Sequence, residues 1–119
     1  MGIVRKTTPA PGRPARGSRS GRPIMALLDL LGRRWTLRIL WELRSEPATF
    51  RALRERCGGL SPTVLNARLR DLRDAGVVEL SDGAGYGTTA HGDALLRALA
   101  PLDQWAKAWA RRRAPKASP

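Results

Sequence analysis

The side chains best suited to chemistry in this sequence lie between Ser61 and Gly76. Short polar and basic side chains recur there three and four residues apart, a spacing that gathers them on one side of an α-helix. Asn can form paired hydrogen bonds with adenine and Arg with guanine, while the methyl groups of Thr and Ala can contact thymine. The residues predicted to face bases are Thr63, Asn66, Ala67 and Arg70. A solvated helix face without a ligand is the alternative interpretation of the same residues.

The same stretch contains the signals that begin and end a helix. Ser61 can cap the first N–H groups, Pro62 suits the first turn, and Gly76 can adopt the left-handed conformation that follows many helices. The side opposite the polar face is apolar and consists of Val64, Leu65, Leu69 and Leu72. We therefore expect a helix of about four turns with one buried side and one basic side.

A second helix is predicted just before it, over residues 51–57, followed by a turn at 58–60. Two helices joined by a short glycine-containing turn form the helix-turn-helix pattern. Side chains around such a motif contact phosphates, which position a protein on DNA without specifying sequence. The residues predicted to contact the DNA backbone are Arg51, Arg54, Ser61, Arg68 and Arg73. Arg68 lies between the polar and apolar sides, so it suits either a base or a phosphate.

Downstream, residues 77–80 and 86–88 have strand composition and flank the turn sequence Asp82-Gly83. A hairpin directly after a helix-turn-helix is a wing. This one carries Glu79 and Asp82 but no Lys or Arg, so we expect its contact with phosphate to be weak or made by backbone N–H groups. As a hypothesis, the basic start of the chain compensates by lying in a minor groove.

Three further helices are predicted, over residues 24–31, 33–44 and 90–111, together with a short strand at 48–50. The first helix has an apolar stripe of Ile24, Leu27, Leu28 and Leu31. The second is apolar nearly all round and should lie at the centre of the core. Thr89 is predicted to cap the last helix, and Pro101 is expected to bend or restart it.

The apolar stripe of the last helix is longer than one small domain can easily cover, so a second copy of the chain is predicted to cover it. The residues predicted to form a dimer interface are Leu27, Leu31, Leu99, Leu102, Trp105 and Trp109. The alternative is that the two Trp side chains fold back onto the first helix of the same chain.

The charge of the chain is concentrated at its ends. Of a net +12 in 119 residues, residues 1–23 contribute six bases and no acid, and residues 111–119 contribute four bases and no acid. We therefore predict a disordered basic arm at 1–22, one winged-helix domain with dimerisation helices at 23–110, and a disordered basic tail at 111–119. The expected fold class is mainly α with a small β-hairpin.

Basic arms attract a polyanion, and double-stranded DNA is the predicted partner. An anionic membrane surface fits the charge equally well. However, no apolar run approaches the ~20 residues that span a bilayer, and the first residues lack the apolar region of a secretory signal. A soluble cytoplasmic protein without membrane contact is therefore expected.

The chain has one cysteine, Cys57, and one histidine, His91. A single cysteine cannot form an internal disulfide or a cysteine zinc cluster, and a single histidine leaves little for metal binding or general base catalysis. No catalytic residue, metal or other cofactor is predicted, and enzymatic activity is not expected. Cys57 is predicted to be a core residue and His91 a surface residue. No convergent polar groups indicate a small-molecule effector.

Several segments match one family's motifs in the same order. They are Leu31–Leu40, Phe50–Leu53, Leu60–Leu72, Gly76–Val78 and Tyr86–Gly92. In these segments the chain resembles the HxlR family of bacterial winged helix-turn-helix regulators, relatives of the MarR group. The resemblance covers about residues 24 to 109. It implies homodimers, joined largely through the first and last helices, that bind inverted repeats near promoters as repressors or activators.

One departure limits what the resemblance implies. Many members of that family have Cys-Pro-Val just before the first helix, and in some of them this cysteine senses electrophiles or oxidants. This chain has Arg22-Pro23-Ile24 there, so redox sensing through that position is excluded.

Two functions from other classes stay open beside the sequence-specific regulator. One is a sequence-tolerant architectural nucleic-acid-binding protein, in which the basic arms dominate and the helix only docks. The other is a winged-helix protein-interaction module whose basic tails serve solubility. The salt dependence and the specificity ratio of DNA binding separate the three.

Overall fold

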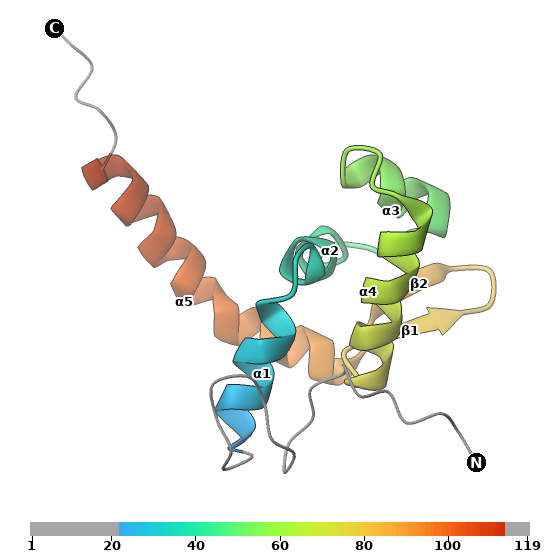
Figure 1. Ribbon diagram of the computed structural model, residues 1–119, viewed down its shortest axis with the longest axis horizontal. Helices are drawn as coiled ribbons and strands as arrows, with labels where there is room; N and C mark the ends of the chain where they lie inside the picture. The colour runs from blue at the N-terminus through green and yellow to red at the C-terminus, as the bar shows by residue number, and fades with distance from the viewer. Residues whose placement is uncertain (1–21, 114–119) are drawn as a thin grey trace, which may run out of the picture.

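The computed structural model describes residues 22–113, which form a helical domain with one β-hairpin (Figure 1). In chain order the elements are α1 (Pro23–Leu31), α2 (Thr36–Glu42), α3 (Phe50–Arg56), α4 (Pro62–Asp74), β1 (Val78–Ser81), β2 (Gly85–Thr88) and α5 (Ala90–Arg113). The winged helix-turn-helix fold and the long C-terminal helix predicted from the sequence are confirmed. Residues 1–21 and 114–119 lie outside the described residues, and α5 extends three residues into the segment 111–119 that was expected to be a disordered tail.

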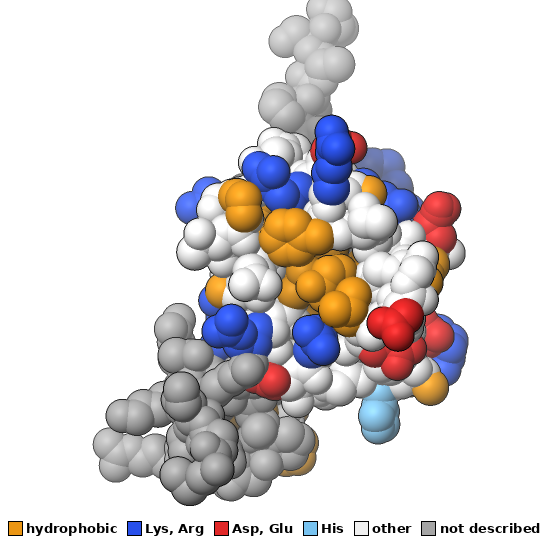
Figure 2. Space-filling model, turned by 90° about the vertical axis from the view of Figure 1, so that its right-hand side faces the viewer, with side chains coloured by type: hydrophobic (Ala, Val, Ile, Leu, Met, Phe, Trp, Pro, Cys, Tyr) orange, Lys and Arg blue, Asp and Glu red, His pale blue; other side chains and the backbone are white. Residues whose placement is uncertain are grey.

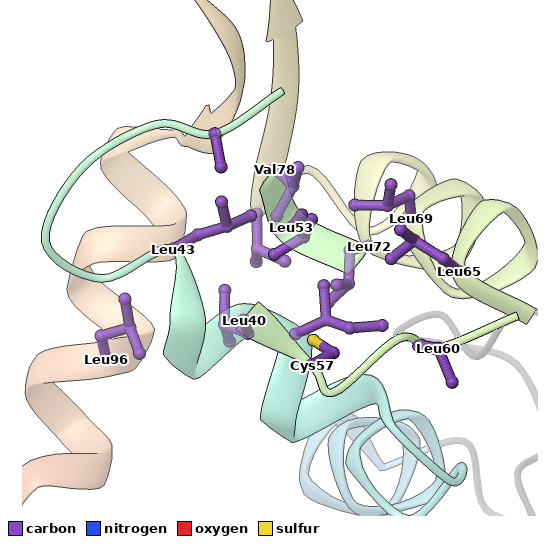
Figure 3. Close-up of a cluster of buried hydrophobic side chains, with 13 residues drawn as sticks. Leu40, Leu43, Leu53, Cys57, Leu60, Leu65, Leu69, Leu72, Val78 and Leu96 are labelled. Carbon is purple, nitrogen blue, oxygen red and sulfur yellow. The ribbon is translucent and has the colours of Figure 1, made fainter. Parts of the chain in front are cut away.

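The core lies where α2, α3, α4 and β1 meet. Ile39 and Leu40 of α2, Leu53 of α3, and Leu65 and Leu72 of α4 are completely inaccessible to solvent. Figure 3 shows these elements directing their side chains into one cluster, which Leu96 of α5 approaches from the side. This packing fixes the inner side of α4, and so it determines which side of that helix faces outward.

The start and end of α4 follow the local sequence signals. The Ser61 hydroxyl accepts a hydrogen bond from the Val64 N–H at 3.5 Å, Pro62 occupies the first turn, and Gly76 has φ +80° just after the helix. The prediction that Val64 lies on the buried side is wrong, because this side chain is 36% exposed. Successive helical residues are rotated by about 100°, so Val64 sits at the edge of the stripe that Leu65 centres.

The connection from α1 to α2 differs from the sequence expectation. Helix α2 was expected to begin at Arg33, but Trp35 has φ +77° and so the helix begins only at Thr36. The packed side of α1 consists of Ala26 and Leu30. The predicted stripe of α1 instead lies largely at the surface, with Ile24 and Leu28 55% and 54% exposed.

The wing is a two-stranded antiparallel hairpin. Its register pairs Val78 with Thr88 and Leu80 with Tyr86. The strand expected at 48–50 is reduced to a single bridge, in which Ala48 and Tyr86 exchange backbone hydrogen bonds of 2.9 and 2.8 Å. At Gly85, with φ +85°, an added Cβ would lie 2.5 Å from the Ala48 carbonyl oxygen, so this close approach requires glycine.

Helix α5 is anchored at its start and projects from the body at its end. The Thr89 hydroxyl accepts a 3.0 Å hydrogen bond from the Gly92 N–H and donates a 2.6 Å bond to the Gly76 carbonyl, which ties α5 to the end of α4. Pro101 lies inside one continuous helix, so the expected restart does not occur. Figure 1 shows the C-terminal half of α5 leaving the rest of the domain. Between Arg22 and Arg113 no helix is long and apolar enough to cross a membrane.

Candidate nucleic-acid interface

Helix α4 presents a polar side to solvent along its length. Thr63, Asn66 and Arg70 are exposed and Ala67 is half-buried, as their helical spacing predicts. The small Ala67 side chain leaves the helix backbone approachable between larger polar neighbours. The structure thus brings all four residues predicted to face bases onto one accessible surface. Their contact with bases stays a prediction.

Two arginines predicted to contact phosphate are also accessible. The Arg51 side chain is 90% exposed, and its Nε lies 3.9 Å from Oε2 of Glu55 on the next turn of α3. A surface ion pair this long contributes little to stability, so it does not commit Arg51 to Glu55. Arg73 is exposed near the end of α4. The two side chains therefore extend the basic surface beyond the central residues of α4.

The other three residues predicted to contact the DNA backbone are engaged within the protein. Arg54 Nε donates a 2.7 Å hydrogen bond to the carbonyl of Leu60, across the turn between α3 and α4. Arg68 Nε lies 3.4 Å from Oδ2 of Asp71, and only 24% of its side chain is exposed. The Ser61 hydroxyl caps α4, as described above. The cap at Ser61 was expected from the sequence, whereas the internal partners of Arg54 and Arg68 were not. Arg54 ties α3 to the turn before α4, and Arg68 pairs with a carboxylate on its own helix.

A groove of about 530 Å³ separates α4 from the wing. Asn66, Arg70 and Arg73 line it from α4, while Leu80 and Tyr86 line it from the wing. Since strand residues two apart share a face, Leu80 follows Val78 toward this groove and pairs across the hairpin with Tyr86. Glu79 of the wing and Asp74 of α4 also line the groove. The wing thus offers apolar side chains and one carboxylate, rather than a cation, next to the basic side of α4.

Figure 2 shows the face of the molecule that carries the wing. Hydrophobic side chains gather at its centre, Lys and Arg side chains lie above and below them, and acidic side chains are concentrated along one edge. The exposed acidic residues of the wing are Glu79 and Asp82. A polyanion would therefore meet favourable charge only on part of this face.

A second exposed surface is apolar and lies on α1, α2 and α5. Leu102, Trp105 and Trp109 are 56%, 61% and 51% exposed, while Leu27, Leu31 and Leu99 are half-buried. The rings of Trp105 and Trp109 stack with centroids 5.8 Å apart and planes 17° apart. In this chain the Trp pair therefore does not fold back onto α1, which was the alternative interpretation.

An apolar groove of about 390 Å³ runs between α2 and α5 beside this surface. It is lined by Leu37 and Trp41 from α2 and by Leu99 and Leu102 from α5, with Arg38 and Asp103 at its edge. Both charged groups already have partners, since Arg38 bonds to Glu42 and Asp103 pairs with Lys107. The groove therefore continues the apolar surface and adds no unpaired charge to it.

Cys57 is buried at the end of α3, as predicted for a core residue. Burial raises the pKa of its thiol above the usual value; nearby Arg38 opposes this shift and Glu42 adds to it. The side chain therefore stays a neutral thiol, the less reactive form. Within the described part of the chain, no group of three or more His, Cys, Asp or Glu side chains could hold a metal ion. His91 is exposed.

Sequence reasoning did not single out two features next to α4. The Leu80 and Tyr86 pair could have been found from the alternation of the strands. Asp71 is buried, with 4% exposure, although it is a charged residue in a helix whose Arg70 and Arg73 are exposed. The available signal was its spacing of three residues from Arg68, which places the two opposite charges side by side on one flank of the helix.

Comparison with known proteins identifies the family. The family model described as HxlR-like helix-turn-helix matches residues 30–114. A protein from Thermoplasma volcanium GSS1 described as an HxlR-family transcriptional factor is 33% identical, with a TM-score of 0.65, over 75% of this chain and 85% of its own. No protein in the curated set matches the chain.

Two further solved structures are similar. Quinone-bound YodB from B. subtilis is 28% identical, with a TM-score of 0.65, over 71% of this chain and 93% of its own. A protein from Enterococcus faecalis V583, assigned to the MarR family of transcriptional regulators, is 27% identical, with a TM-score of 0.67, over 76% of this chain and 88% of its own.

Proposed function

This chain belongs to the HxlR-like helix-turn-helix family of DNA-binding transcriptional regulators, and we propose that it acts as a homodimer on an inverted repeat near a promoter. The observation that carries the proposal is the two-sided character of α4. One side is locked into the core by leucines, and the other presents amide, guanidinium, hydroxyl and methyl groups at helical spacing. Those are the groups that read base edges in a major groove.

We assign separate roles to the residues around α4. Thr63, Asn66, Ala67 and Arg70 face bases, while Arg51 and Arg73 contact phosphates on either side. Arg54, Ser61 and Arg68 support α4 rather than DNA, because their side chains are engaged in the contacts described above.

The homodimer is supported by the apolar surface on α1, α2 and α5. Exposed Trp and Leu side chains on that scale mark an interaction site in a soluble domain. In a two-fold dimer the two α4 helices would enter successive major grooves roughly 34 to 36 Å apart. The matched repeat in DNA would then have half-sites about ten base pairs apart.

Selection of binding sites from random duplexes tests the proposal. We would use the full chain at about 200 mM salt, where non-specific phosphate binding is weakened. An inverted repeat with half-sites at the spacing given above would support it. Tight binding without any recovered motif would favour the architectural protein instead. Absence of binding at low and high salt would favour the protein-interaction module.

A further inference from the structure

A buried ionic cluster joins α4 to the connection between α1 and α2. Arg33 Nη1 lies 3.1 Å from Oδ2 of Asp71, and Arg68 Nε lies 3.4 Å from the same oxygen. The side chains of Arg33 and Asp71 are only 16% and 6% exposed. Two guanidinium groups, one from a loop and one from α4 itself, therefore share one buried carboxylate.

Such a cluster needs an explanation other than stability. Taking charges out of water costs several kcal/mol per ion, and apolar replacements of buried ion pairs are often as stable or more stable. The best-attested use of a buried polar contact is to specify one arrangement among several that an apolar contact would tolerate. Leucine packing fixes which side of α4 faces the core, but it tolerates small rotations of the helix about its axis, because apolar contact is not directional.

The connection that carries Arg33 is itself fixed in one conformation. Trp35, two residues later, has φ +77°, which is rare and costly for a bulky side chain. The Thr36 N–H donates a 3.1 Å hydrogen bond to the Arg33 carbonyl, and Thr36 is completely buried. Arg33 is thus held by a tightly defined turn that directs its side chain into α4.

We propose that Arg33 and Asp71 are positioning residues, which set the rotation of α4 about its own axis and thereby aim Asn66 and Arg70 at the bases. This inference rests on the proposed sequence-specific DNA binding. Asp71 lies on the flank of α4, next along the helix to Arg70. A rotation of about 10° moves an atom roughly 6 Å from a helix axis by about 1 Å, which lengthens a hydrogen bond beyond its effective range. The cluster therefore controls discrimination between bases rather than attraction to DNA.

The test compares variants of the full chain on the duplex selected by the wild type. The measured quantity is the ratio of affinities for that duplex and for one with a single changed base pair in each half-site. Arg33→Gln breaks the pair, Arg33→Lys keeps the charge, and Arg34→Gln is the matched control. Arg34 is the next residue, is exposed, and has the same charge. Its guanidinium lies 5.8 Å from the centre of the Trp35 ring, so this control also reports a disturbance of the turn itself. All measurements are made well below each variant's unfolding temperature.

We expect Arg33→Gln to lower the ratio by about tenfold, which is within the usual effect of one base-pair mismatch. Arg33→Lys should restore part of the discrimination, and Arg34→Gln should leave the ratio within about twofold of the wild type. The salt dependence should be the same for all of them, because no phosphate contact is removed. A general loss of fold would instead lower affinity for both duplexes and leave the ratio unchanged.

The proposal is wrong if Arg33→Gln folds and keeps the wild-type ratio of affinities. It is also wrong if Arg34→Gln lowers that ratio as much as Arg33→Gln does. If Arg33→Gln does not fold, the triple variant Arg33→Gln, Arg68→Gln and Asp71→Asn provides the measurement, since it removes all three charges of the cluster. A wild-type chain that binds all duplexes equally would refute sequence-specific binding itself. In the other two contradicting outcomes the wild type still discriminates between the duplexes, so only the positioning role of Arg33 and Asp71 is refuted.

Discussion

Replacing Trp105 should dissociate the proposed dimer without unfolding the domain. The Trp105 side chain is 61% exposed at the end of α5 that leaves the body of the molecule (Figure 1). A buried aromatic side chain hides up to about 250 Å², so roughly 150 Å² is open for a partner to cover. If the partner covers half of it, each copy contributes about 2 kcal/mol at ~25 cal/mol per Å².

A symmetric dimer contains two copies, so Trp105→Ala should weaken association by about 4 kcal/mol and raise the dimer dissociation constant roughly 700-fold. Sedimentation velocity over a concentration series measures that constant. Trp109→Ala gives a second value, since Trp109 is 51% exposed, but the two effects should not simply add, because the two rings stack on each other. Leu80→Ala is the control, since Leu80 is 49% exposed on the wing.

The reasoning would be refuted by a dissociation constant that neither Trp substitution changes, or by a wild-type chain that stays monomeric at concentrations of about 100 μM, where even the weak interfaces of small proteins are populated. Thermal unfolding provides a necessary check at a concentration where wild type and variant are both monomeric, because there a surface substitution of this kind should change stability by less than about 0.5 kcal/mol. DNA binding gives a second measurement. The Trp105 variant should lose affinity for an inverted repeat and keep its affinity for a single half-site.

Four further results are expected. Arg70→Ala should lower the binding free energy by about 1–3 kcal/mol and relax the base preference at one base-pair position. Arg51→Ala should weaken binding to all duplexes alike. Binding titrations that show uniform losses for both variants would contradict the assignment. Deletion of residues 2–21, which lie outside the described residues and contain five bases, should lower the affinity for DNA and reduce the slope of log affinity against log salt by up to about 4.5, with sequence preference kept. An unchanged affinity would refute the arm hypothesis. Cys57 should react slowly with a thiol reagent until the chain unfolds, and fast reaction of the native protein would contradict its burial. Because burial raises the pKa of this thiol in the folded protein, its contribution to the free energy of unfolding should be lost as pH rises above the ordinary pKa of a thiol. Gly92→Ala should lower the free energy of unfolding by about 1–3 kcal/mol, because the added Cβ would overlap the Val77 carbonyl oxygen. Gly87→Ala is the control, since its Cβ would make an ordinary 3.4 Å contact with Pro47 and should lower the free energy of unfolding by less. Denaturant unfolding measures both values.

The sequence was sufficient to predict α4 and its surroundings because several local signals agree there. The cap at Ser61, the left-handed Gly76 and the spacing of the leucines all indicate the same helix, and the structure contains it. Glycine-rich turns and strand composition likewise predicted the wing. Val64 was misplaced because a position at the edge of an apolar stripe is decided by neighbouring elements, which helical periodicity does not describe.

The destinations of the charged side chains were harder to predict. Helical spacing gives the direction in which Arg68 leaves the axis, but not that Asp71 lies within reach or that Arg33 arrives from another segment. Arg54 turns to a backbone carbonyl for a similar reason, because that contact depends on the geometry of the turn. For α1, the apolar stripe suits packing within the chain and packing between chains equally well, and only the structure shows which side is already used.

The two exposed surfaces are linked by a single element. Helix α5 is tied at its start to the end of α4 through Thr89 and Gly76, and it carries the Trp pair near its other end. With 24 residues it is about 36 Å long, comparable to the distance between successive major grooves. In the proposed dimer, we therefore expect the separation of the two α4 helices to depend on the length of α5. Pro101 lacks the N–H that would bond to the Arg97 carbonyl, so the helix is weakest between its anchored half and the Trp pair.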